Sequence, residues 1–416
     1  MIPYEIPIVS VTIPGVGEVP AGGLVVVVGP NSSGKTQLLR DINACVTGQA
    51  RELVVCENTH VRKPKSFETF VQCLIDQGVI KKTQTSGVEI LSAAVQQSGA
   101  GIGVGDVNCS DAQNWYNSFT GGAVGRSAAA SGQRFLQHFG PMLSTALFLE
   151  NRLRATDQTN TFDYMSQKPG NDLQAFYLSS DARDRLNEEV RSTFGKALGI
   201  DSTRHGILAI RVSDLPEPPM RHWILPDKVS KLRGIESEGD GLRSYCAVCI
   251  ALLLGVRAIC VIDEPEICLH PPQAHALGRF IGNYGTPKEI ATFVATHSSQ
   301  VLRGILETTN DLRIVRLVRI GGRFVGRLVD NELIKESLKR PAARSEVILD
   351  GVFADAVTIV EADGDRVAYQ TAFELGPRPT PRDNYFAAVG GVGGMAETAR
   401  FYRSLHIPVA VIADLD

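Results

Sequence analysis

A run of apolar, mostly β-branched residues from Leu24 to Val28 leads directly into the segment Gly29-Pro30-Asn31-Ser32-Ser33-Gly34-Lys35-Thr36. A continuous apolar run of this length is typical of a strand buried on both faces of a sheet. The residues that follow place four apolar side chains on one face of a helix: Leu38, Leu39, Ile42 and Cys45. The sequence therefore predicts strand, glycine-rich loop and helix in succession, which favours an α/β architecture.

The loop has the pattern G-x-x-x-x-G-K-T in the strand-to-helix context that a phosphate-binding loop requires. Its glycines let the backbone wrap so that N–H groups and the helix N-terminus point at phosphates. Lys35 is expected to meet the β- and γ-phosphate oxygens, and the Thr36 hydroxyl to bind Mg²⁺. The sequence thus predicts ATP and Mg²⁺ as cofactors, with six nucleotide-binding residues: Asn31, Ser32, Ser33, Gly34, Lys35 and Thr36.

Two further apolar runs end in polar residues. Residues 258–262 precede Asp263-Glu264, and residues 291–296 precede His297. Three such strands place a ligand at the carboxyl edge of a mostly parallel sheet. We expect Asp263 to join the Mg²⁺ shell, Glu264 to orient or deprotonate the attacking water, and His297 to contact the γ-phosphate or its water.

Composition excludes several classes of protein. At 416 residues the chain fits two or three domains, and 44% hydrophobic with 21% charged residues describes a globular protein. The net charge of −3 gives no basic signature, so DNA binding would depend on a local patch or on metal. The N-terminus lacks the pattern of a secretory signal, and the most apolar stretch, 245–262, is broken by Arg257 and too short to span a bilayer. A cytoplasmic protein with no membrane partner is expected.

Several of the eight cysteines lie in apolar surroundings, among them Cys268. Cys246 and Cys249 form a C-x-x-C, but no second pair follows at the spacing of a zinc finger. We interpret them as reduced thiols on a helix that is buried in the protein core.

The predicted organisation has two parts. Residues 1–340 form the nucleotide-binding domain, with an inserted region of strands and helices at about 55–235 that includes an exposed amphipathic helix over 181–198. A helix over 333–341 ends at a proline, and the linker candidate is 342–345. A second α/β domain is expected over 346–416.

Carboxylates gather at strand ends in this second domain. Residues 356–360 read as a buried strand before Glu361, and Asp365 opens the helix that follows. Residues 408–413 lead to Asp414 and Asp416, whose i, i+2 spacing puts both on one side of a strand. Hard oxygen ligands of this kind suit Mg²⁺ or Mn²⁺.

The nucleotide motifs resemble those of the ABC-type ATPases of the structural-maintenance and recombination group, close to the OLD (overcoming lysogenization defect) nucleases. The similarity rests on the phosphate loop and on two later segments, Asp263-Glu264-Pro265-Glu266 with Leu269-His270-Pro271, and Ala295-Thr296-His297-Ser298. It implies an ABC-type P-loop ATPase that forms a head-to-tail homodimer or higher oligomer with shared ATP sites. A glutamine that contacts magnesium is also implied, with Gln133 and Gln137 as candidates.

The resemblance further implies a signature loop that closes on the nucleotide of the other subunit. Its best match is Ser237-Glu238-Gly239-Asp240-Gly241-Leu242-Arg243, in which glycine stands where the group usually has serine. Either Ser237 or the backbone of Gly239 would then touch the γ-phosphate, with Asp240 and Gly241 beside it.

The C-terminal region resembles the Toprim domain of OLD-family nucleases. That resemblance makes Glu361, Asp414 and Asp416 metal ligands or acid/base groups, and Asp365 an extra ligand. Ala362 departs from the usual glycine after the glutamate. A Toprim domain normally continues past its Asp-x-Asp, so this one is expected to be incomplete, either because the chain is shortened, because another chain completes it, or because it has lost catalysis; the first is favoured.

These features predict an ATP-regulated, metal-dependent DNA endonuclease that serves in phage defence or DNA processing, with an effector or helicase as a further protein partner. The alternative is an ATPase sensor or scaffold of a defence complex that docks an effector and does not cut nucleic acid. The ATPase of a membrane transporter is disfavoured by the fused C-terminal segment.

Overall fold

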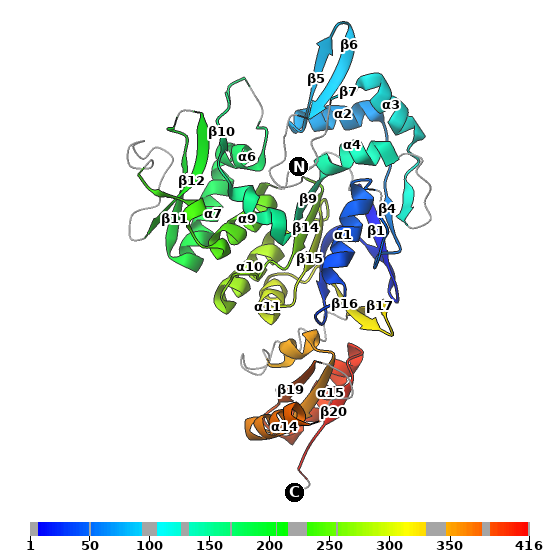
Figure 1. Ribbon diagram of the computed structural model, residues 1–416, viewed down its shortest axis with the longest axis vertical. Coiled ribbons are helices and arrows are strands. Elements are labelled where there is room, and N and C mark those ends of the chain that lie inside the picture. The colour runs from blue at the N-terminus through cyan, green and yellow to red at the C-terminus, as the bar shows by residue number, and fades with distance from the viewer. Residues whose placement is uncertain are drawn as a thin grey trace.

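The computed structural model describes residues 7–49, 51–93, 106–125, 133–166, 169–204, 206–214, 231–254, 257–329, 347–376 and 383–414. At its centre lies a sheet with the strand order β17-β16-β3-β15-β14-β9 (Figure 1). Neighbouring strands are parallel except at the edge, where β17 runs antiparallel to β16. The strands span Gly23–Val28 (β3), Ser144–Leu147 (β9), Ile259–Asp263 (β14), Ala291–Ala295 (β15), Leu312–Ile320 (β16) and Arg323–Val329 (β17).

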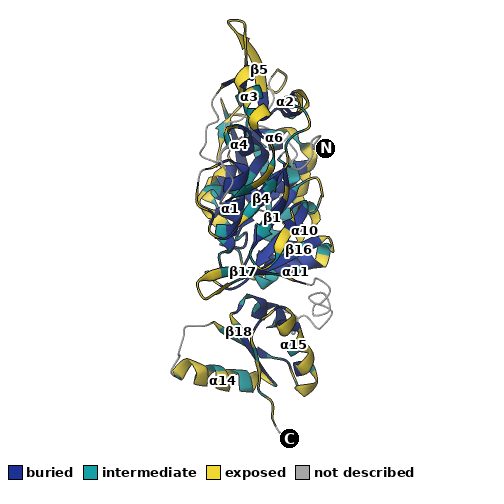
Figure 2. Ribbon diagram, turned by 90° about the vertical axis from the view of Figure 1, so that its right-hand side faces the viewer, coloured by how far each residue is buried: buried dark blue, intermediate teal, exposed yellow. Residues whose placement is uncertain are grey.

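Both faces of this sheet are covered, which explains the continuous apolar run in β3. Leu24 and Val26 belong to one hydrophobic cluster with helices α9, α10 and α11, whereas Val25 and Val27 belong to another with helix α1. Successive side chains of a strand point to opposite faces, so a strand between two helical layers must be apolar at every position. Figure 2 shows the buried centre. The helices span Lys35–Val46 (α1), Asp240–Leu254 (α9), Pro271–Tyr284 (α10) and Ser299–Thr308 (α11).

An antiparallel sheet with the order β2-β1-β4-β8 packs beside α1. The fully buried carboxylate of Asp41 in α1 accepts hydrogen bonds from the backbone N–H groups of Val54, Val55 and Cys56, at 2.9, 2.7 and 3.0 Å, and so fixes the segment before β4. The strands span Ile8–Ile13 (β1), Gly17–Pro20 (β2), Asn58–Val61 (β4) and Gly122–Gly125 (β8).

A small lobe between β4 and β9 has an aromatic core. The ring centroids of Phe70, Phe135 and Phe139 lie 5.0–5.5 Å apart, at separations typical of packed aromatic pairs. A hairpin projects from this lobe at the top of Figure 1. The elements are α2 (Phe67–Asp76), β5 (Ile80–Thr85), β6 (Val88–Ala93), β7 (Val107–Asn108), α3 (Cys109–Ser118) and α4 (Gln133–Leu143).

A second lobe precedes α9. The helix predicted over 181–198 is observed but ends at Phe194, because Gly195 adopts the left-handed conformation (φ 64°) and the residues after it form β11. The elements are α5 (Leu149–Arg152), the 3₁₀ turn η1 (Leu153–Thr156), β10 (Thr159–Asn160), α6 (Asp172–Leu178), α7 (Ser180–Phe194), β11 (Lys196–Asp201), β12 (Ile207–Asp214), β13 (Arg233–Gly234) and η2 (Ile235–Ser237).

The C-terminal segment forms a parallel sheet with the order β19-β18-β20. It is joined to the central sheet through Arg316 of β16, which is 2% exposed and donates from Nε to Val352 O (3.0 Å) and from a terminal nitrogen to Ala354 O (2.7 Å). The elements are η3 (Gly351–Phe353), β18 (Ala356–Val360), α14 (Asp363–Leu375), β19 (Asn384–Ala388), α15 (Val392–Ser404) and β20 (Val409–Val411).

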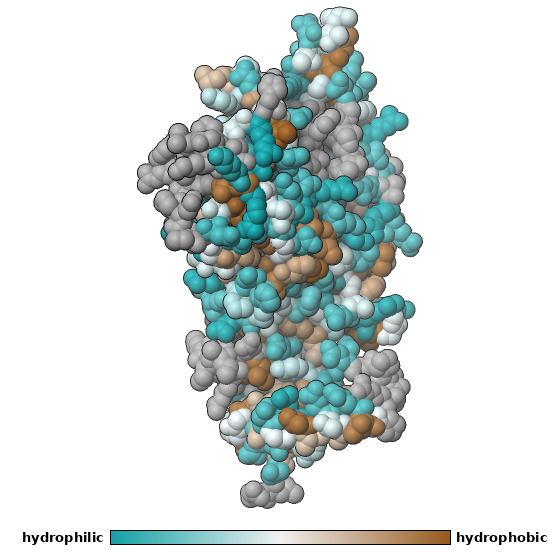
Figure 3. Space-filling model, turned by 60° about the vertical axis from the view of Figure 1, so that its left-hand side comes forward, coloured by the Kyte–Doolittle hydropathy of each residue, from teal (hydrophilic) through white to brown (hydrophobic). Residues whose placement is uncertain are grey.

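Helix α14 has no buried residue, and four of its large apolar or aromatic side chains are exposed: Val367, Tyr369, Phe373 and Leu375. Figure 3 shows apolar patches on the surface of this segment, at the bottom of the view. The predicted linker 342–345 and the predicted helix over 333–341 lie outside the described residues. Cys246 and Cys249 are fully buried in α9 as predicted, whereas Cys268, expected in an apolar setting, is exposed on the loop before α10.

Candidate ATP and metal sites

The phosphate loop connects β3 to α1 and has the backbone of an anion cradle. Gly29 and Gly34 adopt positive φ angles (141° and 94°), and a Cβ on Gly29 would lie 2.1 Å from the carbonyl oxygen of Leu317. Only glycine fits there. Lys35 is buried, and its Nζ donates to the carbonyl oxygens of Gly29 and Pro30 at 2.9 Å. Burial is the largest influence on the Lys35 ammonium and lowers its pKa.

The loop also holds an unused polar group. Ser33 is 2% exposed, and its Oγ has no hydrogen-bond partner among the described residues. Buried hydroxyl groups are seldom left unpaired, so this atom fits a loop built around a polar ligand. With the N-terminus of α1 behind it, the arrangement suits phosphate groups. Asn31 and Ser32 are exposed at the outer side of the same loop.

Two oxygen ligands for a divalent ion converge beside the loop. Thr36 Oγ1 donates to Asp263 Oδ1 at 3.0 Å, across 227 residues of sequence. Burial raises the pKa of Asp263 to about 6. A hydroxyl and a carboxylate at the end of a phosphate loop are the donor set expected for Mg²⁺, so the residues present fit that ion.

Two glutamates that follow Asp263 in the sequence lie against the side chain of His297. Its Nδ1 lies 3.3 Å from Glu264 Oε1 and 3.1 Å from Glu266 Oε1. The hydrogen bond to Glu264 raises the pKa of His297 and lowers the pKa of Glu264. Glu264 adopts a positive φ of 46°, which is uncommon outside glycine and marks a constrained backbone at the site. The structure thus brings together Glu264 and His297, which follow two different predicted strands and lie 33 residues apart in the sequence.

Glu266 is a part of this site to which the sequence analysis assigned no role. Its Oε1 accepts from Thr296 Oγ1 and from the His297 backbone N–H, both at 2.8 Å, and it is 8% exposed. Burial raises the pKa of this carboxyl group. Oε2 is buried and has no partner among the described residues. The sequence signal was a glutamate directly after the acidic pair and the proline.

Arg152 is a second residue that sequence reasoning missed. It is fully buried, and one terminal nitrogen donates to the carbonyl oxygens of Asp263 (2.8 Å) and Glu264 (3.2 Å). Its Nε and other terminal nitrogen are buried without partners among the described residues. Burial lowers its pKa, and the nearby acidic residues act in the opposite direction. No motif surrounds Arg152 in the sequence, so only the fold shows that it supports the backbone of Asp263 and Glu264.

The signature loop lies at the surface of this chain. Ser237, Gly239 and Asp240 are exposed, and Ser237 Oγ donates to Gly234 O at 2.7 Å. Gly241 approaches the backbone so closely that a Cβ would lie 2.4 Å from Cys268 O. Within the described part of the chain, no hydrogen bond or ion pair joins residues 237–241 to the chain's own phosphate loop.

The two glutamines proposed as magnesium contacts are not at the phosphate loop. Gln133 donates from Nε2 to Gly48 O at 3.1 Å, and the backbone of Gln137 also lies against Gly48. Gly48 follows the C-terminal end of α1, about 18 Å from the N-terminal end that carries the loop, at 1.5 Å per residue. The prediction was wrong because it relied on residue type and not on helix direction.

The C-terminal carboxylates lie at one edge of the β19-β18-β20 sheet. Glu361 directly follows β18, and its backbone oxygen accepts from Gly390 N (2.8 Å) and Gly391 N (3.0 Å) in the loop after β19. Asp414 is exposed beyond β20, which runs parallel to β18. Asp365 Oδ2 accepts from Ala362 N at 3.0 Å and so also caps α14. Asp416 lies outside the described residues, and the described ones hold no cluster of three metal-binding side chains.

Two models of protein families match separate parts of the chain. A model of the TOPRIM domain of overcoming lysogenization defect protein-like proteins matches residues 352–416. A model of an AAA domain, described as putative AbiEii toxin of a type IV toxin–antitoxin system, matches residues 167–303. No curated protein matches the chain. Across the described residues, no helix has the length and apolar character needed to cross a membrane.

Solved structures that resemble the chain include heads of Smc proteins. One is an Smc head bound to the C-terminal winged-helix domain of ScpA, at 12% identity and a TM-score of 0.44, covering 81% of this chain and 100% of that chain. Another is the Smc head from Pyrococcus furiosus with an extended coiled coil, bound to the C-terminal domain of ScpA, at 11% identity and a TM-score of 0.40, covering 80% and 98%. The Smc head from Thermotoga maritima has 12% identity and a TM-score of 0.34, covering 77% and 97%.

Proposed function

Because this chain is an ATPase fused to a Toprim domain of the OLD family, we propose that it is an ATP-hydrolysing protein coupled to a metal-dependent DNA endonuclease. The observation that carries the ATPase half is the contact of His297 with Glu264 and Glu266 at the same sheet edge as the phosphate loop. We further propose residues 1–340 and 346–416 as the two domains.

In this proposal Lys35 and the loop N–H groups bind the β- and γ-phosphates. Mg²⁺ bound by Thr36 and Asp263 would neutralise charge on those phosphates. Glu264 accepts a hydrogen bond from the attacking water and orients it in line with the γ-phosphorus. His297 donates to the γ-phosphate, since the neighbouring carboxylates favour its protonated form.

The signature loop is proposed to act on the ATP of a second copy. Its residues Ser237, Gly239 and Asp240 are exposed, and among the described residues they form no hydrogen bond or ion pair with the phosphate loop of their own chain. A homodimer, or a higher oligomer of such dimers, would place the signature loop of each copy over the nucleotide of the other. Each of the two ATP sites would then consist of the phosphate loop of one copy and the signature loop of the other.

A turnover assay tests the ATPase. The Glu264→Gln variant keeps the size of the side chain and removes its charge, so it should bind ATP, hydrolyse it at least about a hundredfold more slowly and accumulate as a dimer. Glu289→Gln, an exposed change on the loop before β15, is the matched control and should turn over normally. Equal turnover of the Glu264→Gln variant and the parent would disprove the assignment.

For the C-terminal domain, Glu361, Asp365, Asp414 and Asp416 are the proposed Mg²⁺ or Mn²⁺ ligands. The parallel strands that carry Glu361 and Asp414 to one sheet edge support this assignment. We propose phosphodiester cleavage of DNA, in phage defence or DNA processing, in the cytoplasm. Supercoiled plasmid should be nicked in the presence of Mg²⁺ or Mn²⁺ by the parent and not by Asp414→Ala; nicking that persists in the variant would count against this site.

One observation favours the alternative, an ATPase scaffold that docks an effector or helicase and does not cut. Asp365 already caps α14, because its Oδ2 accepts a hydrogen bond from Ala362 N. Under this alternative the parent would hydrolyse ATP and leave plasmid intact with either metal.

A further inference from the structure

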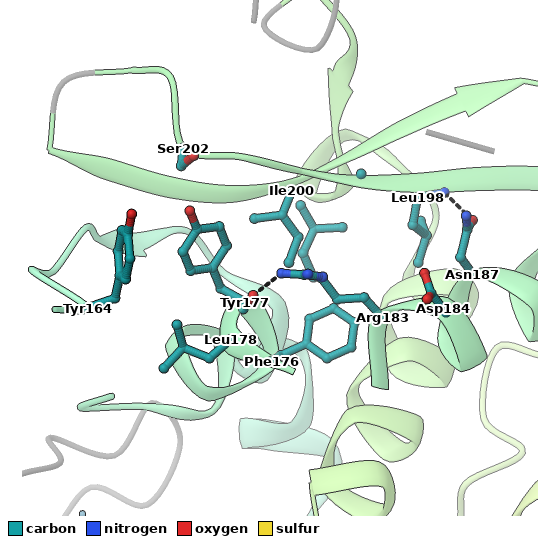
Figure 4. A pocket seen from close by; sticks show the side chains of 12 residues that line it. Tyr164, Phe176, Tyr177, Leu178, Arg183, Asp184, Asn187, Leu198, Ile200 and Ser202 are labelled. Carbon is teal, nitrogen blue, oxygen red and sulfur yellow. Dashed lines mark hydrogen bonds between the residues drawn. The ribbon is translucent and has the colours of Figure 1, made fainter. Parts of the chain in front are cut away.

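A cavity of about 290 Å³ lies between helices α6 and α7 on one side and strand β11 on the other (Figure 4). Its lining comes from residues 164–210 and contains none of the residues assigned to the ATP site or to the C-terminal carboxylates. Its volume is at the lower end of the range for small-molecule sites, which is enough for one small ligand.

Arg183 in the lining of this cavity forms no salt bridge among the described residues, although the adjacent carboxylate of Asp184 acts on it electrostatically. Arg183 of α7 donates from a terminal nitrogen to the backbone oxygen of Tyr177, but its Nε is buried and has no partner among the described residues. No carboxylate of the described chain forms a salt bridge with it. Arg185, on the same helix, instead pairs with Asp181 at 2.8 Å and points elsewhere. A buried N–H of a guanidinium that lacks an acceptor is costly, so an anionic ligand would stabilise Arg183.

Beside this cation the cavity has flat apolar walls. Figure 4 shows the rings of Tyr164 and Tyr177 standing next to one another and pointing toward β11, with Ile200 above and the guanidinium of Arg183 on the inner side of Tyr177. Aromatic faces of this kind bind planar rings by stacking, without requiring a particular ring. The exposed Asp184 and Ser202 add a hydrogen-bond acceptor and a hydroxyl to the lining.

We propose that this cavity binds one nucleotide, separately from the ATP site. The base lies against Tyr164 and Tyr177, and the phosphate pairs with Arg183. The size of the cavity limits the occupant to a single nucleotide unit. That unit can be a free mononucleotide or the phosphorylated end of a nucleic-acid strand, because both present the same base and phosphate.

The test uses the full chain carrying Lys35→Ala, which disables the phosphate loop, so that any remaining binding is separate from the proposed ATP hydrolysis. Adenosine 5′-monophosphate and a 5′-phosphorylated decathymidylate are titrated by calorimetry. Arg183→Gln and Tyr164→Leu are then added singly. Tyr164 is 58% exposed, so its replacement leaves the core intact. Arg191→Gln, at an exposed position of the same helix, is the matched control.

We expect saturable binding at one site per chain, weakened about tenfold by the loss of a base-stacking ring and at least as much by the loss of the cation. The Arg191→Gln control should bind like its parent. Binding of the monophosphate identifies a free nucleotide as the occupant, and binding of the decathymidylate alone identifies a strand end. No binding of either probe at millimolar concentration, or binding that Arg183→Gln leaves unchanged, overturns the proposal. ATP turnover of the chain with intact Lys35 is measured separately and tests the proposed hydrolysis alone.

Discussion

Glu266 provides the sharpest test of how the ATP site is held together. Its carboxylate lies 3.1 Å from His297 Nδ1 and also accepts hydrogen bonds from the His297 backbone and from Thr296. Glu266→Gln keeps the shape and one carbonyl oxygen, so both neutral donors can still be satisfied. What is lost is the charge beside the imidazole.

A hydrogen bond to a charged group contributes about 1.5–3 kcal/mol, and the lower value corresponds to about a tenfold change in rate. We therefore expect kcat for ATP hydrolysis to fall about tenfold in Glu266→Gln while KM changes little, because the residue orients His297 and does not contact the nucleotide. Steady-state hydrolysis at varied ATP concentration separates the two constants.

The stability of the folded Glu266→Gln variant, unlike its rate of ATP hydrolysis, should not fall. Burial raises the pKa of Glu266 above its ordinary value of 4.5, so the folded protein binds a proton more tightly than the unfolded chain. The stability associated with that proton is present below pH 4.5 and is lost as the pH rises through the folded pKa. Glutamine has no charge to bury, and the variant should be at least as stable as the parent at neutral pH.

The chain offers a matched control for this substitution. Glu307 in α11 contacts His275 of α10 at 2.9 Å, in an exposed pair away from the phosphate loop. Glu307→Gln removes the same kind of contact and should leave kcat unchanged. If Glu266→Gln, with a Tm no lower than that of the parent, hydrolyses ATP within about twofold of the parent, the positioning role is wrong.

Three other expectations follow from buried polar groups. Burial raises the pKa of Asp263 in the folded protein to about 6, above its ordinary value of 3.8, so the stability that its proton contributes, about 3 kcal/mol at most, is lost as the pH rises through 6. In EDTA, Asp263→Asn should therefore raise the Tm more at pH 8 than at pH 5. An equal rise at both pH values would contradict this. Arg152→Met removes the donor to Asp263 O and Glu264 O, so ATP turnover should fall at least about tenfold, and turnover equal to the parent would refute a supporting role. Arg316→Met leaves two carbonyl oxygens unpaired, so it should lower the free energy of unfolding by about 3 kcal/mol and speed hydrogen exchange in residues 352–360. Arg327→Met, a control at a half-buried arginine of β17, should do neither.

The sequence predicted the parts of the site that depend on local pattern. The loop Gly29–Thr36, the pair Asp263-Glu264 and His297 each follow a buried strand, and parallel strands bring their carboxyl ends to one edge. The same logic placed Glu361 and Asp414 at one edge of the smaller sheet.

Other features of the structure could not be predicted from the sequence. Strand β9 completes the central sheet with only four residues, Ser144–Leu147, too few to show a clear period. The glutamine candidates failed because residue type says nothing about which end of α1 a neighbouring helix meets. The helix predicted over 181–198 ran past Gly195, where a left-handed residue ends it and β11 begins.

What the sequence by itself determined is therefore the nucleotide chemistry and the order of the two domains, because these are written in short segments whose residues are neighbours along the chain. The tertiary structure alone decided which buried groups support that chemistry. Arg152 reaches Asp263 across 111 residues, and Glu266 reaches the His297 backbone across 31. A buried donor forms a hydrogen bond with an acceptor that lies within about 3 Å of it. Strand pairing and helix packing decide which acceptor that is, and the local pattern of the sequence does not predict it.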